Sequence, residues 1–382
     1  AEDIRQARAA FFPKIAAVPT IIYTTPSLAT AAPGIPRPPS FLGANAITEY
    51  QVLSNTSGQL DLSGRLKAEL KRSEFLLASA KAGTAIARLE LVSAVADAYY
   101  GLALASTRRS AAEENLSTAL EFENNTRLQL AAGEVAPVDL VRARLQSAAR
   151  RDELTQSMAD EKVASANLQY LIGGKIADGI STVNLLTQLP QAGEIDRISQ
   201  AAIAARPEFA MFDADAAAAR QEARVAASER KLQLNYSVST GVLSDSLGSS
   251  GIKSGFGDQV SIGINFTLFD RGASRSRETQ ARLRMQQAEN SRQLAERALT
   301  QIFFAAKTQA AAAESRIRLL ADSISDAEQN LTASLARYRS GEASIIEVTD
   351  AQNLLINHRQ SLYQAIYDYQ IARSRLLRAI GQ

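Results

Sequence analysis

Alternating apolar and polar residues mark four short segments of the chain as β-strands. The two clearest are residues 232–242 and 260–268, where apolar side chains alternate with Gln, Asn, Ser, Gly and Thr. A period of two gives a strand one apolar and one polar face. Residues 241–258, rich in Gly and Ser, are predicted to connect them. Two less regular strands are predicted at roughly residues 12–23 and 47–60, on either side of a Pro-rich loop.

Two further stretches, residues 65–132 and 273–340, contain no proline and predict helices of unusual length. A helix of about 68 residues spans about 100 Å at 1.5 Å per residue, whereas the mean helix has about 11–12 residues. In the last segment of the chain, apolar residues recur every seven positions and predict a coiled-coil seam. These residues are Val348, Leu355, Leu362, Tyr369 and Leu376.

The chain repeats itself after 208 residues. Gly64 then aligns with Gly272, the pair Gly133-Glu134 aligns with Gly341-Glu342, and the Ile-Gly pair at 172 aligns with that at 380. Each half has two strands, a very long helix, a Gly-centred turn and a second helix. We therefore predict a first repeat over 1–172, a linking segment rich in Gly, Ser and Gln over 173–206, and a second repeat over 207–382.

The two repeats differ at their beginnings. Residues 208–230 predict an Ala-rich helix of roughly six turns before the second pair of strands, whereas only residues 1–10 precede the first pair. The sequence also begins without the features of a signal peptide. We expect that the N-terminus is truncated within a longer helix.

Composition narrows the function classes. The chain has 42 basic and 40 acidic residues mixed throughout, which gives no concentrated basic face for a nucleic acid. It has no Cys and one His, His358, which predicts a plain surface or lumen residue and neither a disulfide nor a Cys/His metal site. No nucleophile–base pair or phosphate loop is evident, so we expect neither an enzyme nor a cofactor.

Two groups of tyrosines, 99–100 and 363–369, resemble stacking platforms for nucleic-acid bases. Because no basic groove accompanies them, we expect these rings to pack between helices.

The four amphipathic strands imply assembly. No run of 18 apolar residues is present to form a transmembrane helix. Four strands cannot close a barrel, and open strand edges are not viable in a bilayer. Three chains would pool their strands into a twelve-stranded barrel. The predicted fold class is therefore mainly α with a β-barrel portion. Long coiled-coil hairpins would continue from it as a helical tunnel.

Four motifs carry a family resemblance. They are Val95 to Tyr100, Arg127 to Ala143 around Gly133-Glu134, Leu268 to Gly272, and Arg337 to Ala351 around Gly341-Glu342. Their order and the duplicated plan resemble the TolC-like outer-membrane efflux proteins of Gram-negative bacteria over essentially the whole chain. The resemblance implies a homotrimer in outer-membrane lipid that extends into the periplasm. It would be the exit duct of a tripartite efflux or type I secretion system, with a periplasmic adaptor and an inner-membrane pump as partners.

The resemblance also implies a periplasmic gate at Glu347 and Asp350. These residues are three apart, so they share one face of a helix. Around a threefold axis they would form two rings of three carboxylates, which select cations. The alternative is that they are ordinary solvated charges near a helix N-terminus.

A polar lock between hairpins is implied at Tyr338 and Asp139. The family has a basic residue two positions after the second-tip glycine, where this chain has Ala343. Arg339 could substitute for it.

The two hairpin tips are the implied adaptor-docking surface. Gly133 and Gly341 would supply a left-handed turn, with Glu134 and Glu342 following them. Arg127, Arg337 and Arg339 could pair with adaptor carboxylates or complement the ends of their own helices.

Two other classes of protein stay open at this point. A periplasmic adaptor also has a long helical hairpin, but usually one hairpin flanked by compact β domains. A cytosolic coiled-coil scaffold conflicts with the four strand signals. The sequence does not identify the cargo, which could be a drug, a metal ion or a secreted protein.

Overall fold

The computed structural model describes residues 1–28, 37–40, 47–175, 180, 182–191, 193–246 and 253–381. The chain divides into two compact units. The first comprises residues 1–82 and 210–293, and the second comprises 83–209 and 294–382. Both sequence repeats contribute to each unit, so the repeat boundaries predicted from the sequence are not the boundaries of compact units.

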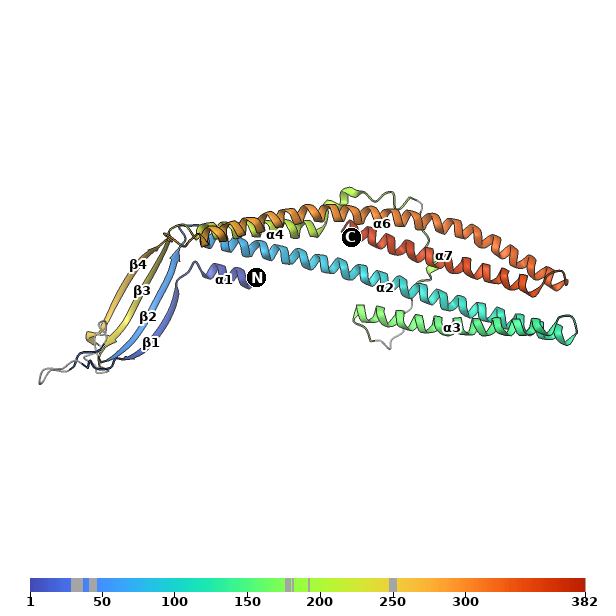
Figure 1. The fold of residues 1–382 in the computed structure, drawn as a ribbon, viewed down its shortest axis with the longest axis horizontal. Coiled ribbons are helices and arrows are strands. Elements are labelled where there is room, and N and C mark those ends of the chain that lie inside the picture. Colours follow the sequence, from blue (N-terminus) through green and yellow to red (C-terminus); the bar gives the residue numbers. More distant parts are fainter. Residues whose placement is uncertain are drawn as a thin grey trace. The chain divides into compact units, whose positions relative to one another are not determined.

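The first unit contains one antiparallel sheet with the strand order β1-β2-β3-β4 (Figure 1). Its strands are β1 (Lys14–Tyr23), β2 (Thr48–Leu60), β3 (Gln233–Ser244) and β4 (Phe256–Asn265). Each repeat supplies two neighbouring strands, and β2 pairs with β3 to join the two pairs. The four predicted strands are therefore present.

Two boundaries in the second strand pair differ from the prediction. β4 ends at Asn265 rather than at 268, because Asn265 pairs with Gln233, the first residue of β3, and the residues after it have no partner on β3. The predicted loop over 241–258 is too long. Residues at both ends of the predicted loop belong to the strands, because the ladder between β3 and β4 continues to the pair Val242 and Phe256. Small residues can take part in this ladder, since backbone hydrogen bonds do not depend on side-chain size.

The predicted long helices agree with the structure to within one residue at their C-terminal ends. α2 spans Arg65–Ala131 and α6 spans Ala273–Arg339. The predicted Ala-rich helix is α4 (Pro207–Ser228), and the short N-terminal segment forms α1 (Glu2–Ala9).

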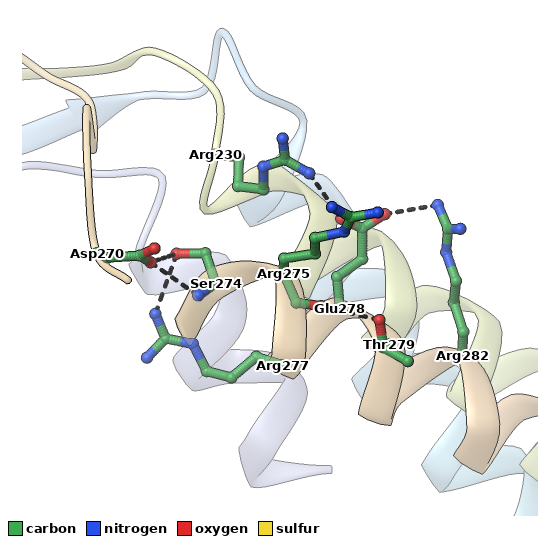
Figure 2. Close-up of polar contacts among 8 residues, drawn as sticks. All are labelled: Arg230, Asp270, Ser274, Arg275, Arg277, Glu278, Thr279 and Arg282. Atoms are coloured by element: carbon green, nitrogen blue, oxygen red, sulfur yellow. Dashed lines mark hydrogen bonds and ion pairs between the residues drawn. The ribbon is translucent and has the colours of Figure 1, made fainter. Parts of the chain in front are cut away.

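A compact polar turn connects β4 to α6 and includes the third family motif, Leu268 to Gly272 (Figure 2). Arg271 and Gly272 both have left-handed backbone angles, with φ of 54° and 86°. The Asp270 carboxylate accepts hydrogen bonds from the backbone N–H groups of Ser274 at 2.7 Å and Gly272 at 3.0 Å. Hydrogen bonds from Ser274 hold the pKa of Asp270 below its usual value. Asp270 thus satisfies backbone donors at the start of α6.

Just after this turn, Glu278 bridges two elements (Figure 2). Its carboxylate contacts Arg282 on the same helix at 2.5 Å and Arg230, which follows α4, at 3.4 Å. Three more ion pairs join α4 to α6 and one joins it to α2. They are Arg284–Glu222, Arg220–Glu289, Arg292–Asp213 and Arg72–Glu222. Each ion pair is partly exposed and by itself contributes little to stability. The position of α4 therefore depends on all of these ion pairs together.

The second unit contains two helical hairpins and the linking segment (Figure 1). The remainder of α2 turns into α3 (Pro137–Ile172), and the remainder of α6 turns into α7 (Ile345–Ala379). The predicted seven-residue seam is confirmed. Val348, Leu355, Tyr369 and Leu376 are buried, and Leu362 packs against the core.

Part of the linking segment is held against α7. It contains two short 3-10 helices, η1 (Leu185–Thr187) and η2 (Gln200–Ala205). Glu194 accepts hydrogen bonds from the Tyr369 hydroxyl at 3.1 Å and from Arg373 at 2.6 Å.

The tyrosines that the sequence assigned to helix packing do pack there. Tyr363 and Tyr369 are buried in the main core cluster. Tyr99 and Tyr100 meet edge to face with ring centroids 5.5 Å apart.

Candidate functional site

Both hairpin tips turn in the same way. After α2, Gly133 has φ of 80° and the Glu134 N–H donates to the Gln129 carbonyl at 2.9 Å. After α6, Gly341 has φ of 76° and the Glu342 N–H donates to the Arg337 carbonyl at 2.8 Å. These are the left-handed helix ends that favour glycine. The conformation predicted for both tip glycines is confirmed.

Close to the tips, the two hairpins share a small apolar cluster. Phe122 from α2 and Ala143 from α3 are buried with Ile345 and Val348 of α7. The rings of Phe122 and Tyr338 of α6 have centroids 5.8 Å apart. Sequence reasoning missed Phe122. The signal was its position, because residues nearly equidistant from a hairpin turn, such as 122 and 143, face each other across it.

The predicted lock residues lie near each other without a direct bond. Asp139 forms an ion pair with Arg142 of its own helix at 3.8 Å. The Tyr338 hydroxyl is buried and makes no hydrogen bond of good geometry with a described residue. Burial raises the pKa of Tyr338; the nearby Thr126 hydroxyl opposes this, and the negative charge of Asp139 adds to it. Packing against Phe122 thus holds the Tyr338 ring, and the Tyr338–Asp139 lock remains a hypothesis.

The two predicted gate carboxylates have unlike surroundings. Glu347 forms an ion pair with Arg337, across the tip turn of its own hairpin. Asp350 is exposed and has no ion pair with a described residue. The contact also gives Arg337 an intramolecular partner, which favours a role at its own hairpin over one in docking.

The remaining polar residues of the tips face solvent in the single chain. Arg127 donates a hydrogen bond to Asn124 one helical turn earlier, at 2.6 Å. Glu134, Arg339 and Glu342 are exposed. The tips therefore present charged groups of both signs.

Further from the tips, a polar seam joins α3 to α7. The amide of Gln146 donates to Gln352 at 2.5 Å, and Gln360 donates to Glu153 at 2.7 Å. Between these contacts, Arg150 donates to Asn353 at 2.5 Å. Sequence reasoning did not find this seam, because its residues lie about 200 positions apart and follow no local pattern.

Beside the seam, Arg359 of α7 links three helices. It contacts Glu328 of α6 at 2.9 Å and Glu114 of α2 at 3.5 Å. With Gln146, Arg150 and other residues it lines a cavity of about 180 Å³. The hairpins are therefore held together by apolar packing near the tips and by polar contacts further along.

In the sheet, the strand register collects apolar residues of all four strands on one face. Ile264 lies opposite Leu234, which lies opposite Leu60. Two longer rows repeat this pattern: Val260–Val238–Thr56–Ile15 and Phe256–Val242–Val52–Pro19. Val260, Ile262 and Ile264 are each 65–71% exposed. An apolar face of this extent marks a surface for lipid or a partner.

No helix among the described residues combines the length and apolarity needed to cross a membrane. No cluster of three or more His, Cys, Asp or Glu side chains that could hold a metal ion occurs among them. His358 is partly exposed on α7.

A four-stranded sheet with one apolar face, combined with two long helical hairpins, is the fold of solved outer-membrane channels. The structure of the outer-membrane channel OprN matches with a TM-score of 0.84 and 20% identity, over 99% of this chain and 83% of that one. A structure of CusC matches with a TM-score of 0.86 and 21% identity, over 99% and 85%.

The sequence gives the particular family. The family model described as outer membrane efflux protein matches residues 1–174 and 198–382, and the chain belongs to that family. The cation efflux system protein CusC of Escherichia coli K12 is 28% identical over 353 residues, which are 87% of this chain and 73% of that protein. The outer membrane efflux protein BepC of Brucella suis biovar 1 is 23% identical over 295 residues. The match covers 77% of this chain and 62% of BepC.

The predictions of fold class, family and outer-membrane location are therefore confirmed. Both alternatives, a periplasmic adaptor and a cytosolic scaffold, are set aside by the family match over both repeats. The family is one of transport proteins, which agrees with the expectation of a channel rather than an enzyme.

Proposed function

We propose that three copies of this chain form the exit duct of a tripartite efflux or type I secretion system. The observation that carries the proposal is the sheet. Among the described residues, β1 pairs only with β2 and β4 only with β3, so two strand edges are free. Unpaired backbone groups cost several kcal/mol each in a lipid environment. Strands from other copies would satisfy them.

The number of copies follows from the space inside a barrel. Two copies would give eight strands, and an eight-stranded barrel is nearly filled by its own side chains. Three copies would give twelve strands, an even number within the range of outer-membrane barrels, with room for a lumen. The apolar face of the sheet would then meet lipid and the polar face would line the lumen.

The hairpin tips are the proposed periplasmic end of the duct. Their mixed charges at Arg127, Glu134, Arg339 and Glu342 would dock an adaptor that connects the duct to an inner-membrane pump. Asp350, together with Glu347, would form the acidic constriction. The three-residue spacing of Glu347 and Asp350 on α7 and the exposure of the Asp350 side chain support this assignment.

Sedimentation in mild detergent tests the assembly. We expect one species near three times the 41.0 kDa mass of the chain. It should form ion-conducting pores in planar bilayers, because the lumen would be open to water. A stable monomer that keeps its full strand content by circular dichroism would contradict the proposed assembly. A trimer that does not conduct would contradict the duct.

A further inference from the structure

Three segments join the sheet to the helices of the first compact unit. Residues 61–72 run from β2 into the first two turns of α2, residues 229–232 join α4 to β3, and residues 266–280 run from β4 into the first two turns of α6. All three meet the same edge of the sheet, because β2 and β4 end where β3 begins. We call these three segments the junction, and Figure 2 shows part of it.

The junction is basic, whereas the remainder of the chain is not. Of the 42 basic and 40 acidic residues, nine and five lie in the junction, so that 33 and 35 lie elsewhere. The nine are Arg65, Lys67, Lys71, Arg72, Arg230, Lys231, Arg271, Arg275 and Arg277. The positive excess of the chain is therefore concentrated where the sheet meets the helices.

Each of the five carboxylates of the junction already has a partner. Asp270 and Glu278 make the turn and the ion pairs described above (Figure 2). The other three contacts, each of 3.0 Å, are Asp61 with the backbone N–H of Lys67, Glu69 with Arg65, and Glu229 with Arg277. These contacts engage some of the arginines and leave other cations without a counter-charge.

Four cations of the junction make neither an ion pair nor a side-chain hydrogen bond with a described residue. They are Lys67, Lys71, Arg271 and Arg275, and all four are exposed. Lys67 and Arg275 occupy equivalent positions under the shift of 208 residues. Lys71 lies one helical turn after Lys67, on the same face of α2. Both repeats thus present unpaired positive charge at the same level of the structure.

Exposed apolar side chains accompany these cations. Leu268 is 85% exposed and Phe269 is 82% exposed, and Leu62 follows β2 with 71%. Phe266 and Leu268 also continue the alternation of the apolar face of the sheet beyond the end of β4. Apolar side chains next to Lys and Arg are typical of a surface that lies in the membrane interface.

The length of the strands places the junction at the depth of lipid headgroups. The four strands have 10 to 13 residues, and a tilted strand of about 9–11 residues crosses the hydrocarbon core. Residues beyond the strand ends therefore lie outside the hydrocarbon. The headgroup layer adds about 5–8 Å on each side, and two helical turns rise about 11 Å. Long Lys and Arg side chains of the first two turns can reach this layer.

We propose that the junction binds the phosphate groups of anionic phospholipids in the periplasmic leaflet of the outer membrane. Arg offers paired N–H donors that match a phosphate, and Lys adds a point charge. The exposed Leu and Phe side chains would contact the first part of the acyl chains. The inference rests on the part of the proposed function that sets the apolar face of the sheet against lipid. It does not depend on the number of copies or on conduction.

A single fluorophore tests this contact. The chain has no tryptophan, so Leu268→Trp introduces one into the junction, and brominated phospholipids quench it where they touch it. In bilayers of mixed lipid, brominated phosphatidylglycerol should compete at least about fivefold better than brominated phosphatidylcholine, which corresponds to one cation near an anionic surface. The preference should weaken in about 1 M KCl, where the Debye length falls to about 3 Å.

Removing the unpaired cations should remove the preference. In the Leu268→Trp chain, Lys67, Lys71, Arg271 and Arg275 are replaced together by Gln. The two brominated lipids should then compete to within about twofold of each other. Quenching by phosphatidylcholine should stay as it was, which shows that the variant is folded and inserted.

The matched control removes four exposed basic side chains of the second compact unit. Arg88, Arg151, Lys162 and Arg297 also make no ion pair with a described residue. Their replacement by Gln changes the net charge of the chain equally. The control should keep the full preference for phosphatidylglycerol.

Three results are decisive. If neither lipid quenched the fluorophore, the junction would not lie at the membrane surface, and the proposal would be overturned. Equal competition by the two lipids before any charge is removed, or an equal loss in the control variant, would also overturn it, and a neighbouring copy or an acidic protein would be the partner of these cations. A trimer that keeps the preference but does not conduct would overturn the proposed duct and support the lipid contact.

Discussion

Glu347 and Asp350 lie on the same face of α7, but only Glu347 has an ion-pair partner within its hairpin. We therefore predict that Asp350→Ala weakens cation selectivity and block by divalent cations more than Glu347→Ala does. The reason is that Arg337 already compensates the Glu347 charge. Reversal potentials and titrated block in planar bilayers measure both effects.

The control for the gate prediction is Arg337→Ala, which removes the compensating charge and should strengthen cation selectivity. If the double Ala variant at 347 and 350 kept its selectivity and its divalent block, both residues would be ordinary solvated helix charges.

Tyr338 allows two explanations of hairpin closure to be separated. If a hydrogen bond to Asp139 is the lock, Tyr338→Phe should favour the open state. The structure instead buries the hydroxyl without a hydrogen bond of good geometry to any described residue, so we predict that Tyr338→Phe leaves the conductance unchanged and loses no stability. Phe122→Ala should open the tip, because it removes about 3 kcal/mol of packing. Conductance of each variant decides between the two.

The conformation of a single residue can be predicted from the sequence more easily than its tertiary contacts. Gly133 and Gly341 were predictable because a left-handed helix end is a local requirement. The partners of Tyr338 were not, because Phe122 lies more than 200 residues away and is brought near by the packing of two hairpins.

Among the elements, the tip turns can be tested by replacing their glycines. Gly341→Ala should destabilise the hairpin by about 1 kcal/mol, because Ala strongly disfavours the φ of 76° found there. No atom crowds this position, so the cost is conformational. Denaturant unfolding followed by circular dichroism measures the change.

Gly83 provides a matched control for this substitution. It lies inside α2, and a Cβ there would also meet no atom within 4 Å. Gly83→Ala should therefore stabilise the chain by about 0.5–1 kcal/mol. Equal effects of the two substitutions would show that the backbone angle at the tip is unimportant.

At the scale of the whole molecule, buried tyrosines predict an alkaline limit to stability. Burial, with the nearby negative charge of Glu194, raises the pKa of Tyr369 to about 12. Burial also raises the pKa values of Tyr363 and Tyr367. An unfolded tyrosine loses its proton near pH 10. Stability should thus be complete below pH 10 and fall as the pH rises toward 12, because only the unfolded chain releases these protons.

Tyr369→Phe tests this pH dependence. The variant loses the hydrogen bond to Glu194 and about 1 kcal/mol of stability at neutral pH. Its stability should then decline less steeply between pH 10 and 12 in urea unfolding experiments. The exposed Tyr170→Phe is the control and should keep the natural slope. An identical slope in both variants would show that Tyr369 does not contribute.

The helices, the tip turns, the strand alternation and the family could all be predicted from the amino-acid sequence. Each of these depends on residues near one another in the chain: freedom from proline over residues 65–132 and 273–340, glycine at 133 and 341, and a period of two over 260–264. The duplication then showed that the plan occurs twice. Sequence patterns of this kind act within one segment, so they can be recognised without knowing which other segments pack against it.

The contacts between the two repeats could not be predicted in this way and become visible in the folded chain. Pairing of β2 with β3 sets the register that gathers apolar residues on one face and leaves Lys14 and Glu49 as the only charges of the strands on the other. Packing of the two hairpins selects the polar seam of α3 with α7. Both results join residues about 200 positions apart. Such pairs form because backbone donors and apolar side chains must be satisfied together, a requirement that no short stretch of sequence records.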